Sequence, residues 1–215
     1  MHRPTPALIS QAHRRIAAEP RWRPVKRYTS STLAADVRVW LTDNGSLTGQ
    51  LVASGQGEFR VQRLYQGWEV PLPSERRLLD LPPRQLALVR EVALLLDSTA
   101  VVFARSIFPI SSLVGSLAHL RRLHNTSLGA ILFKYPGMHR SPFELARMAG
   151  DCDYLPHSLR QSGPAWGRRS RFEVEGKKLM VSEVFLRAFA PWHAALSMHR
   201  TQRGKVSAAF RAPTQ

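Results

Sequence analysis

Cysteine is nearly absent from this 215-residue chain, since Cys152 is the only one. A single thiol excludes an internal disulfide and any zinc site built on several cysteines. Long apolar runs are missing as well. The longest candidate, residues 92–108, is interrupted by Asp97 and Arg105 and does not reach the ~18 apolar residues of a membrane span.

Acidic residues are few, with 15 Asp and Glu against 31 Lys and Arg. Residues 1–27 hold seven Lys or Arg and one acid, and residues 198–215 hold four and no acid. We interpret these stretches as a basic N-terminal extension and a basic C-terminal tail around one domain, residues 28–197. Arg14 and Arg15 interrupt any signal-peptide apolar segment, so a cytoplasmic protein is expected.

The net charge of +16 admits a nucleic-acid-binding module, but nothing besides charge favours it. No aromatic residues interleave with the basic ones, and no zinc-finger spacing occurs. Solvated tails and a polyanion or membrane-surface role therefore both remain open.

Motifs for several common chemistries are also absent. The eight histidines show no metal-ligand spacing, and no Gly-x-Ser-x-Gly element marks a nucleophilic serine. Gly55 and Gly57 lack the third glycine and the βαβ setting of a dinucleotide site. We expect neither a metal nor an organic cofactor.

Alternation and turn signals indicate an α+β class: a single domain with an antiparallel sheet of about six strands and helices packed on it. The clearest pair is a hairpin of residues 87–96 and 100–108 around Asp97-Ser98. Further strands are expected at residues 58–68, 170–175 and 179–186, and helices at residues 33–41, 47–53, 111–124 and 128–133, with a helical turn at residues 10–18.

Three charged side chains share a strand face with large apolar neighbours, namely Arg90, Arg105 and Glu183. Side chains two residues apart lie on the same face of a strand. The antiparallel hairpin allows both arginines to lie on the same sheet face, although not directly opposite each other.

These charges have two interpretations. One is a buried Arg–Glu–Arg ion triad that serves only the fold. The other is an internal site for a small carboxylate, because two cations against one anion leave a positive excess that is costly to bury alone. A carboxylate bound bidentately by arginine would neutralise it.

The chain resembles the chorismate lyase family over roughly residues 36–190. Five segments in order carry the resemblance: Val89-Arg90-Glu91-Val92, Ala104-Arg105-Ser106-Ile107-Phe108-Pro109, Ser127-Leu128-Gly129-Ala130-Ile131-Leu132-Phe133, Trp166-Gly167-Arg168-Arg169-Ser170-Arg171 and Leu179-Met180-Val181-Ser182-Glu183-Val184-Phe185-Leu186.

The resemblance implies a cofactor-independent carbon–oxygen lyase that converts chorismate into 4-hydroxybenzoate and pyruvate, the first committed step of ubiquinone synthesis. It implies an internal site under helical lids, a monomer, and tight binding of product. Arg90 would bind the ring carboxylate, Glu183 the ring hydroxyl, and Arg105 the enolpyruvyl carboxylate, while the backbone at Leu128 and near Arg63 would line the site.

A second class of function fits the same fold, namely a non-catalytic domain that binds a small carboxylate effector in a transcription regulator. That interpretation expects a DNA-binding helix-turn-helix domain before residue 30, and the chain ahead of residue 30 is too short for one.

Overall fold

The computed structural model describes residues 18–193 and 196, which form one antiparallel sheet of eight strands. Its order is β1-β6-β7-β8-β4-β3-β2, with β5 paired to β7. The strands are β1 (Arg23–Pro24), β2 (Phe59–Glu69), β3 (Ala87–Leu96), β4 (Thr99–Pro109), β5 (His139–Arg140), β6 (Glu144–Ala149), β7 (Pro164–Val174) and β8 (Lys177–Phe185). The expected α+β class is confirmed, and β6 and the two-residue strands β1 and β5 add to the strands located from the sequence.

The helices are short, and serine caps begin two of them. They are α1 (Ala35–Thr42), α2 (Leu47–Ala53), α3 (Pro73–Leu79) and α4 (Leu128–Leu132). The Ser46 hydroxyl accepts a hydrogen bond from the Gly49 amide at the start of α2, and the Ser127 hydroxyl accepts one from the Ala130 amide at the start of α4.

The helix expected at residues 111–124 is replaced by two 3-10 helical segments, Ile110–Ser112 and Gly115–Arg122. Gly115 has a φ of 58°, a left-handed conformation that a continuous right-handed helix does not accept. Leu113, Leu117 and Leu120 are nevertheless fully buried, and they lie in one apolar cluster with Leu88 and Phe172 of the sheet.

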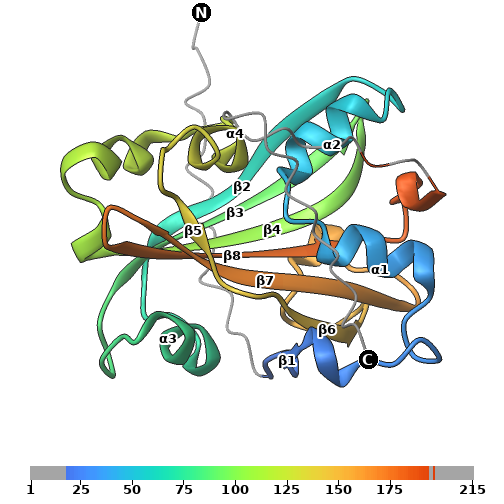
Figure 1. Ribbon diagram of the computed structural model, residues 1–215, viewed down its shortest axis with the longest axis horizontal. Helices are drawn as coiled ribbons and strands as arrows, with labels where there is room; N and C mark the ends of the chain where they lie inside the picture. The colour runs from blue at the N-terminus through green and yellow to red at the C-terminus, as the bar shows by residue number, and fades with distance from the viewer. Residues whose placement is uncertain (1–17, 194–195, 197–215) are drawn as a thin grey trace, which may run out of the picture.

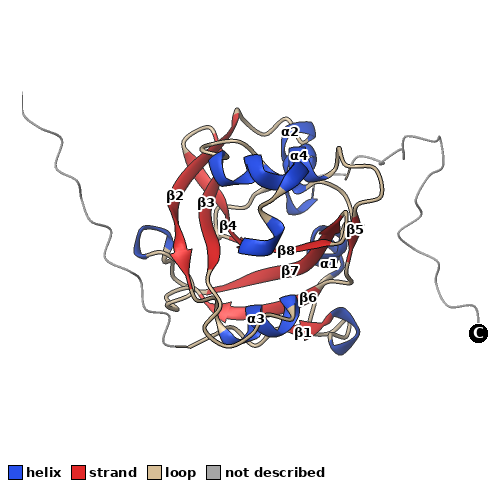
Figure 2. Ribbon diagram, turned by 90° about the vertical axis from the view of Figure 1, so that its left-hand side faces the viewer, coloured by secondary structure: helices blue, strands red, loops and turns tan. Residues whose placement is uncertain are grey.

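The curved sheet has helices on both faces (Figures 1 and 2). On one face lie α1, α2 and α4, where Trp40 and Leu41 of α1 pack with Val92 and Phe185. On the other face lies α3, whose Leu79 packs in a cluster of strand residues, Ala87, Val89, Ile107 and Met180. Both faces of the central strands are therefore buried.

Part of the stretch expected as an N-terminal extension belongs to the sheet, because β1 pairs with β6. Trp22, just before β1, packs edge-on against Tyr154. Residues 1–17 of that extension lie outside the described residues, as do nearly all of the helical turn expected at residues 10–18 and the whole C-terminal tail, residues 198–215. No helix among residues 18–193 is long and apolar enough to cross a membrane.

Candidate active site

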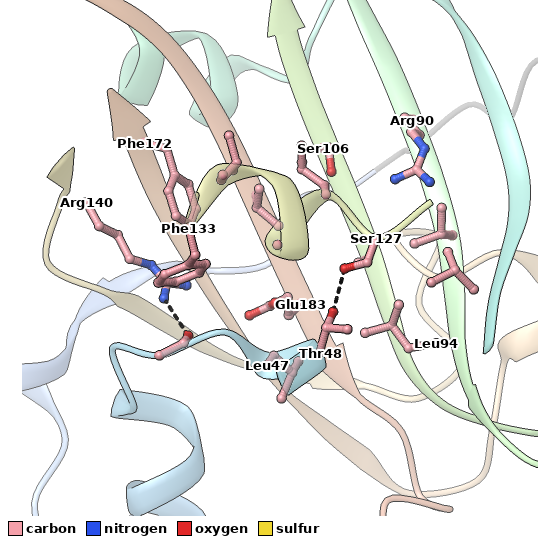
Figure 3. Close-up of a pocket in the computed structure, with 18 residues that line it drawn as sticks. Leu47, Thr48, Arg90, Leu94, Ser106, Ser127, Phe133, Arg140, Phe172 and Glu183 are labelled. Carbon is pink, nitrogen blue, oxygen red and sulfur yellow. Dashed lines mark hydrogen bonds between the residues drawn. The ribbon is translucent and has the colours of Figure 1, made fainter. Parts of the chain in front are cut away.

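A cavity lies between the sheet and the helices α2 and α4, and Arg90 and Glu183 both line it (Figure 3). In the strand register, Arg90 of β3 pairs with Ser106 of β4, and Glu183 of β8 pairs with Ala104 of β4. Paired residues in a ladder point to the same face, so this register brings the two charges to one side of the sheet. The space between the lining atoms is about 520 Å³, its opening to solvent included.

Arg90 has no carboxylate partner among the described residues. Its Nη2 atom donates hydrogen bonds to the carbonyl oxygens of both His124 and Thr126, at 2.9 and 2.8 Å. Its Nε atom is buried and has no hydrogen-bond partner there. Burial, and secondarily the nearby Arg63, lowers the pKa of Arg90 to about 10. An anion in the cavity would relieve this uncompensated charge.

Glu183 is bound on one side only. Its Oε2 atom accepts a hydrogen bond from Nε of Arg168 at 2.6 Å, and Arg168 also donates to the carbonyl oxygens of Trp40 and Asp43. Within the described residues Oε1 accepts no hydrogen bond, so it can serve a ligand. Arg168 thus fixes the Glu183 carboxylate in place and ties it to the end of α1.

The prediction that Arg105 shares a face with Arg90 is wrong. Arg105 pairs with Glu91 in the register and lies on the opposite face, 3% exposed. Its Nε donates to Glu75 and its Nη1 to Glu91, both at 2.8 Å. Burial opposes its charge, but these carboxylates and Tyr154 outweigh that and raise the pKa of Arg105 above its usual range. This arginine is neutralised inside the fold.

A β-bulge in β4 is the reason that Arg105 lies on the opposite face from Arg90. Next to the two-residue turn, Leu96 pairs with Thr99 and Leu95 pairs with Ala100. The next residue of β3, Leu94, pairs with Val102 and not with Val101. The skipped residue, Val101, shifts the ladder by one position. A shift of one residue moves every later side chain of that strand to the other face.

Of the two predicted backbone contacts, Leu128 lines the cavity and Arg63 does not. Leu128 is the first residue of α4, where an amide has no partner inside the helix. Arg63 has an exposed side chain, and its amide donates to the Asn125 side chain. On β2 it is Val61 that reaches the cavity.

Two arginines near the cavity were not predicted. Arg168 shares a face of β7 with Trp166 and Phe172, but the strand expected at residues 170–175 begins after it, so alternation gives no prediction for Arg168. Arg140 lines the cavity from β5, whose two residues are too short for any periodicity. Sequence pattern therefore gives no signal for Arg140.

The helices over the cavity meet at one side-chain hydrogen bond. The hydroxyls of Thr48 in α2 and Ser127 at the start of α4 are 2.7 Å apart (Figure 3). A side chain at Gly129 would approach the Ser46 hydroxyl at 3.2 Å, so the glycine permits this close approach. Residues 18–193 contain no group of three acidic, histidine or cysteine side chains placed to hold a metal ion.

The fold and the site together define an α+β protein with an internal, positively charged cavity suited to a small organic anion. A family model described as chorismate lyase matches residues 19–194. Two relatives, each named probable chorismate pyruvate-lyase, come from Pseudomonas aeruginosa (42% identity, 73% of this chain and 86% of that protein) and Alcanivorax borkumensis (40%, 78% and 76%). The chain belongs to the chorismate lyase family.

Among solved structures, the effector domain of PhnF from Mycobacterium smegmatis aligns with a TM-score of 0.48 and 15% identity. The alignment covers 68% of this chain and 90% of that domain. A likeness at this level gives no evidence on function.

Proposed function

We propose that this protein is a chorismate pyruvate-lyase that converts chorismate into 4-hydroxybenzoate and pyruvate. The observation that carries the proposal is the pair of Arg90 and Glu183, which face one internal cavity in a chain of this family. Arginine without a carboxylate partner suits an anionic group, and a carboxylate with a free oxygen suits a hydroxyl.

In this proposal Arg90 binds the ring carboxylate, with the Leu128 amide beside it, and Glu183 meets the C4 hydroxyl. The C3–O bond breaks, the proton on C4 leaves, and the ring becomes aromatic. Glu183 accepts or relays that proton. Enolpyruvate leaves and takes up a proton at its methylene carbon to become pyruvate.

Aromatisation supplies the driving force, so the work of the protein is to position the substrate and neutralise its charge. No step needs a metal or an organic cofactor. The apolar side chains that line the cavity beside its charged groups also hold a flat product well, and opening of α2 and α4 is then a slow step in turnover. We place the enzyme in the cytoplasm as a monomer, supplying 4-hydroxybenzoate for ubiquinone synthesis.

The test is to mix the purified protein with chorismate and follow both products, 4-hydroxybenzoate by absorbance and pyruvate by a coupled assay. Equimolar release of the two is expected. Arg90→Ala should lose at least about 100-fold in kcat/KM, because charge-assisted hydrogen bonds to the ring carboxylate disappear. Circular dichroism checks that this variant stays folded.

Binding of 4-hydroxybenzoate without any turnover would instead support the effector-binding domain. Salt-dependent DNA binding without turnover would support the nucleic-acid module. An Arg90→Ala variant with near-wild-type kcat/KM would remove Arg90 from the site.

A further inference from the structure

Arg140 lies in the same cavity as Arg90, at the opposite side, with Glu183 between them in the view of Figure 3. Its guanidinium stacks on the rings of Phe143 and Phe172, at 4.1 and 4.7 Å from their centres. Stacking of this kind fixes the plane of the guanidinium and leaves its edge for a ligand. Arg140 is therefore a positioned group and not a loose surface cation.

The hydrogen bonds of Arg140 leave donor capacity. Its Nε donates to the Ser170 hydroxyl at 2.7 Å, and its Nη1 donates weakly to the Gly45 carbonyl oxygen at 3.4 Å. Its Nη2 donates to no atom of the described residues. Guanidinium groups bind carboxylates through two donors at once, and Nη2 with the weakly used Nη1 offers such a pair.

The charge of Arg140 is also uncompensated. No ion pair joins Arg140 to an acidic group of the described residues. The nearby Glu183 instead pairs with Arg168, at 2.6 Å. Burial and the neighbouring Arg168 lower the pKa of Arg140 to about 9, and the attraction of Glu183 and Asp43 does not offset them. A desolvated cation in this state favours a bound anion.

We propose that Arg140 binds the carboxylate of the enolpyruvyl group, while Arg90 binds the carboxylate of the ring. This subsite rests on the proposed function. Chorismate carries two carboxylates, and the cavity holds two arginines without carboxylate partners, one on each side of Glu183. As the C3–O bond breaks, its electrons pass to the departing enolpyruvate, whose carboxylate stays on Arg140.

The product makes the assignment testable, because 4-hydroxybenzoate retains only the ring carboxylate. Arg140 then contributes to substrate binding and to departure of enolpyruvate, and contributes little to binding of 4-hydroxybenzoate. Arg90 contributes to both ligands. A structural role for Arg140 would affect the two ligands alike.

The first experiment compares Arg140→Met with the wild type, because methionine keeps apolar contact with the two phenylalanines. We expect kcat/KM for chorismate to fall about 100-fold, as two charge-assisted hydrogen bonds are lost. The Kd of 4-hydroxybenzoate, measured by calorimetry, should change less than about 3-fold. Arg147→Met on β6, at an exposed arginine outside the cavity, is the matched control and should behave as the wild type.

The second variant is Arg140→Lys, read as a pH profile. Burial, together with Arg168, depresses the pKa of a lysine at this place, while Glu183 and Asp43 oppose that shift. The lysine binds the carboxylate only below its pKa, so kcat/KM should be partly restored at low pH and lost as pH rises. The loss should begin at lower pH than in the wild type.

Equal losses for chorismate and 4-hydroxybenzoate, or no loss for either, would overturn the subsite while leaving the lyase in place. A wild-type protein that does not turn over chorismate would instead remove the proposed function, and the subsite with it.

Discussion

At the scale of single residues, inward-facing charges differ in what neutralises them. Arg105 has two buried carboxylates, Glu183 has Arg168, and Arg90 and Arg140 have neither within the described residues. Arg90, Arg105 and Glu183 look alike to a sequence-based argument, which detects only that a charge shares a face with apolar neighbours, and the two-residue strand of Arg140 is too short to show that pattern. Whether the partner belongs to the protein or to a ligand depends on contacts between distant strands.

Glu183→Gln tests the part of this carboxylate in catalysis. Glutamine keeps the shape and one acceptor oxygen but cannot take up the proton, so kcat should fall about 100-fold while the substrate still binds. Steady-state kinetics with chorismate give both kcat and KM. Glu173→Gln, at a carboxylate of β7 outside the cavity, is the control. An unchanged kcat would leave Glu183 an orienting role only.

At the scale of elements, alternation and caps located most strands and helices correctly. The hairpin expected from residues 87–96 and 100–108 is confirmed by β3 and β4. Helix α2 occupies residues 47–53 as expected, because Ser46 and the break at Gly55-Gln56-Gly57 bound it on both sides. The sequence pattern of residues 143–148 fits a helix or a strand equally well. In the structure residues 144–148 pair with β7 and form most of strand β6. The bulge at Val101 has no such local signal, and it alone moved Arg105 to the other face.

The ion pairs of Arg105 with Glu75 and Glu91 join α3 to the sheet. Arg105→Met leaves Glu75 and Glu91 buried without their cation, which should lower the free energy of unfolding by about 3–5 kcal/mol. Urea denaturation measures this loss. Since Arg105 does not line the cavity, kcat per folded molecule should stay near that of the wild type at temperatures well below Tm.

A triple variant provides the control for Arg105. Adding Glu75→Gln and Glu91→Gln to Arg105→Met removes all three charges and should recover part of the lost stability. A stable Arg105→Met protein that has lost activity would place Arg105 back among the substrate-binding groups.

At the scale of the whole molecule, the fold stores an excess of positive charge inside its cavity. The sheet supplies Arg90 and Arg140 from strands on either side of Glu183, and the helices α2 and α4 close over them. Each buried cation without a carboxylate partner destabilises the protein in the absence of a bound anion. Binding of an anion and stability of the fold are therefore coupled through the same cavity.

This coupling predicts a large thermal shift with product. At 100 times its Kd, 4-hydroxybenzoate should stabilise the fold by about 2.7 kcal/mol. For a domain of this size that raises Tm by about 5–10 °C, which differential scanning fluorimetry resolves. The uncharged 4-hydroxybenzamide at the same concentration should produce little shift, because it brings no anion to Arg90. Acetate controls for general anion binding to a basic surface, and Arg90→Ala should abolish the response. An equal shift with the amide would mean that the cavity selects the ring by its shape and not by its charge.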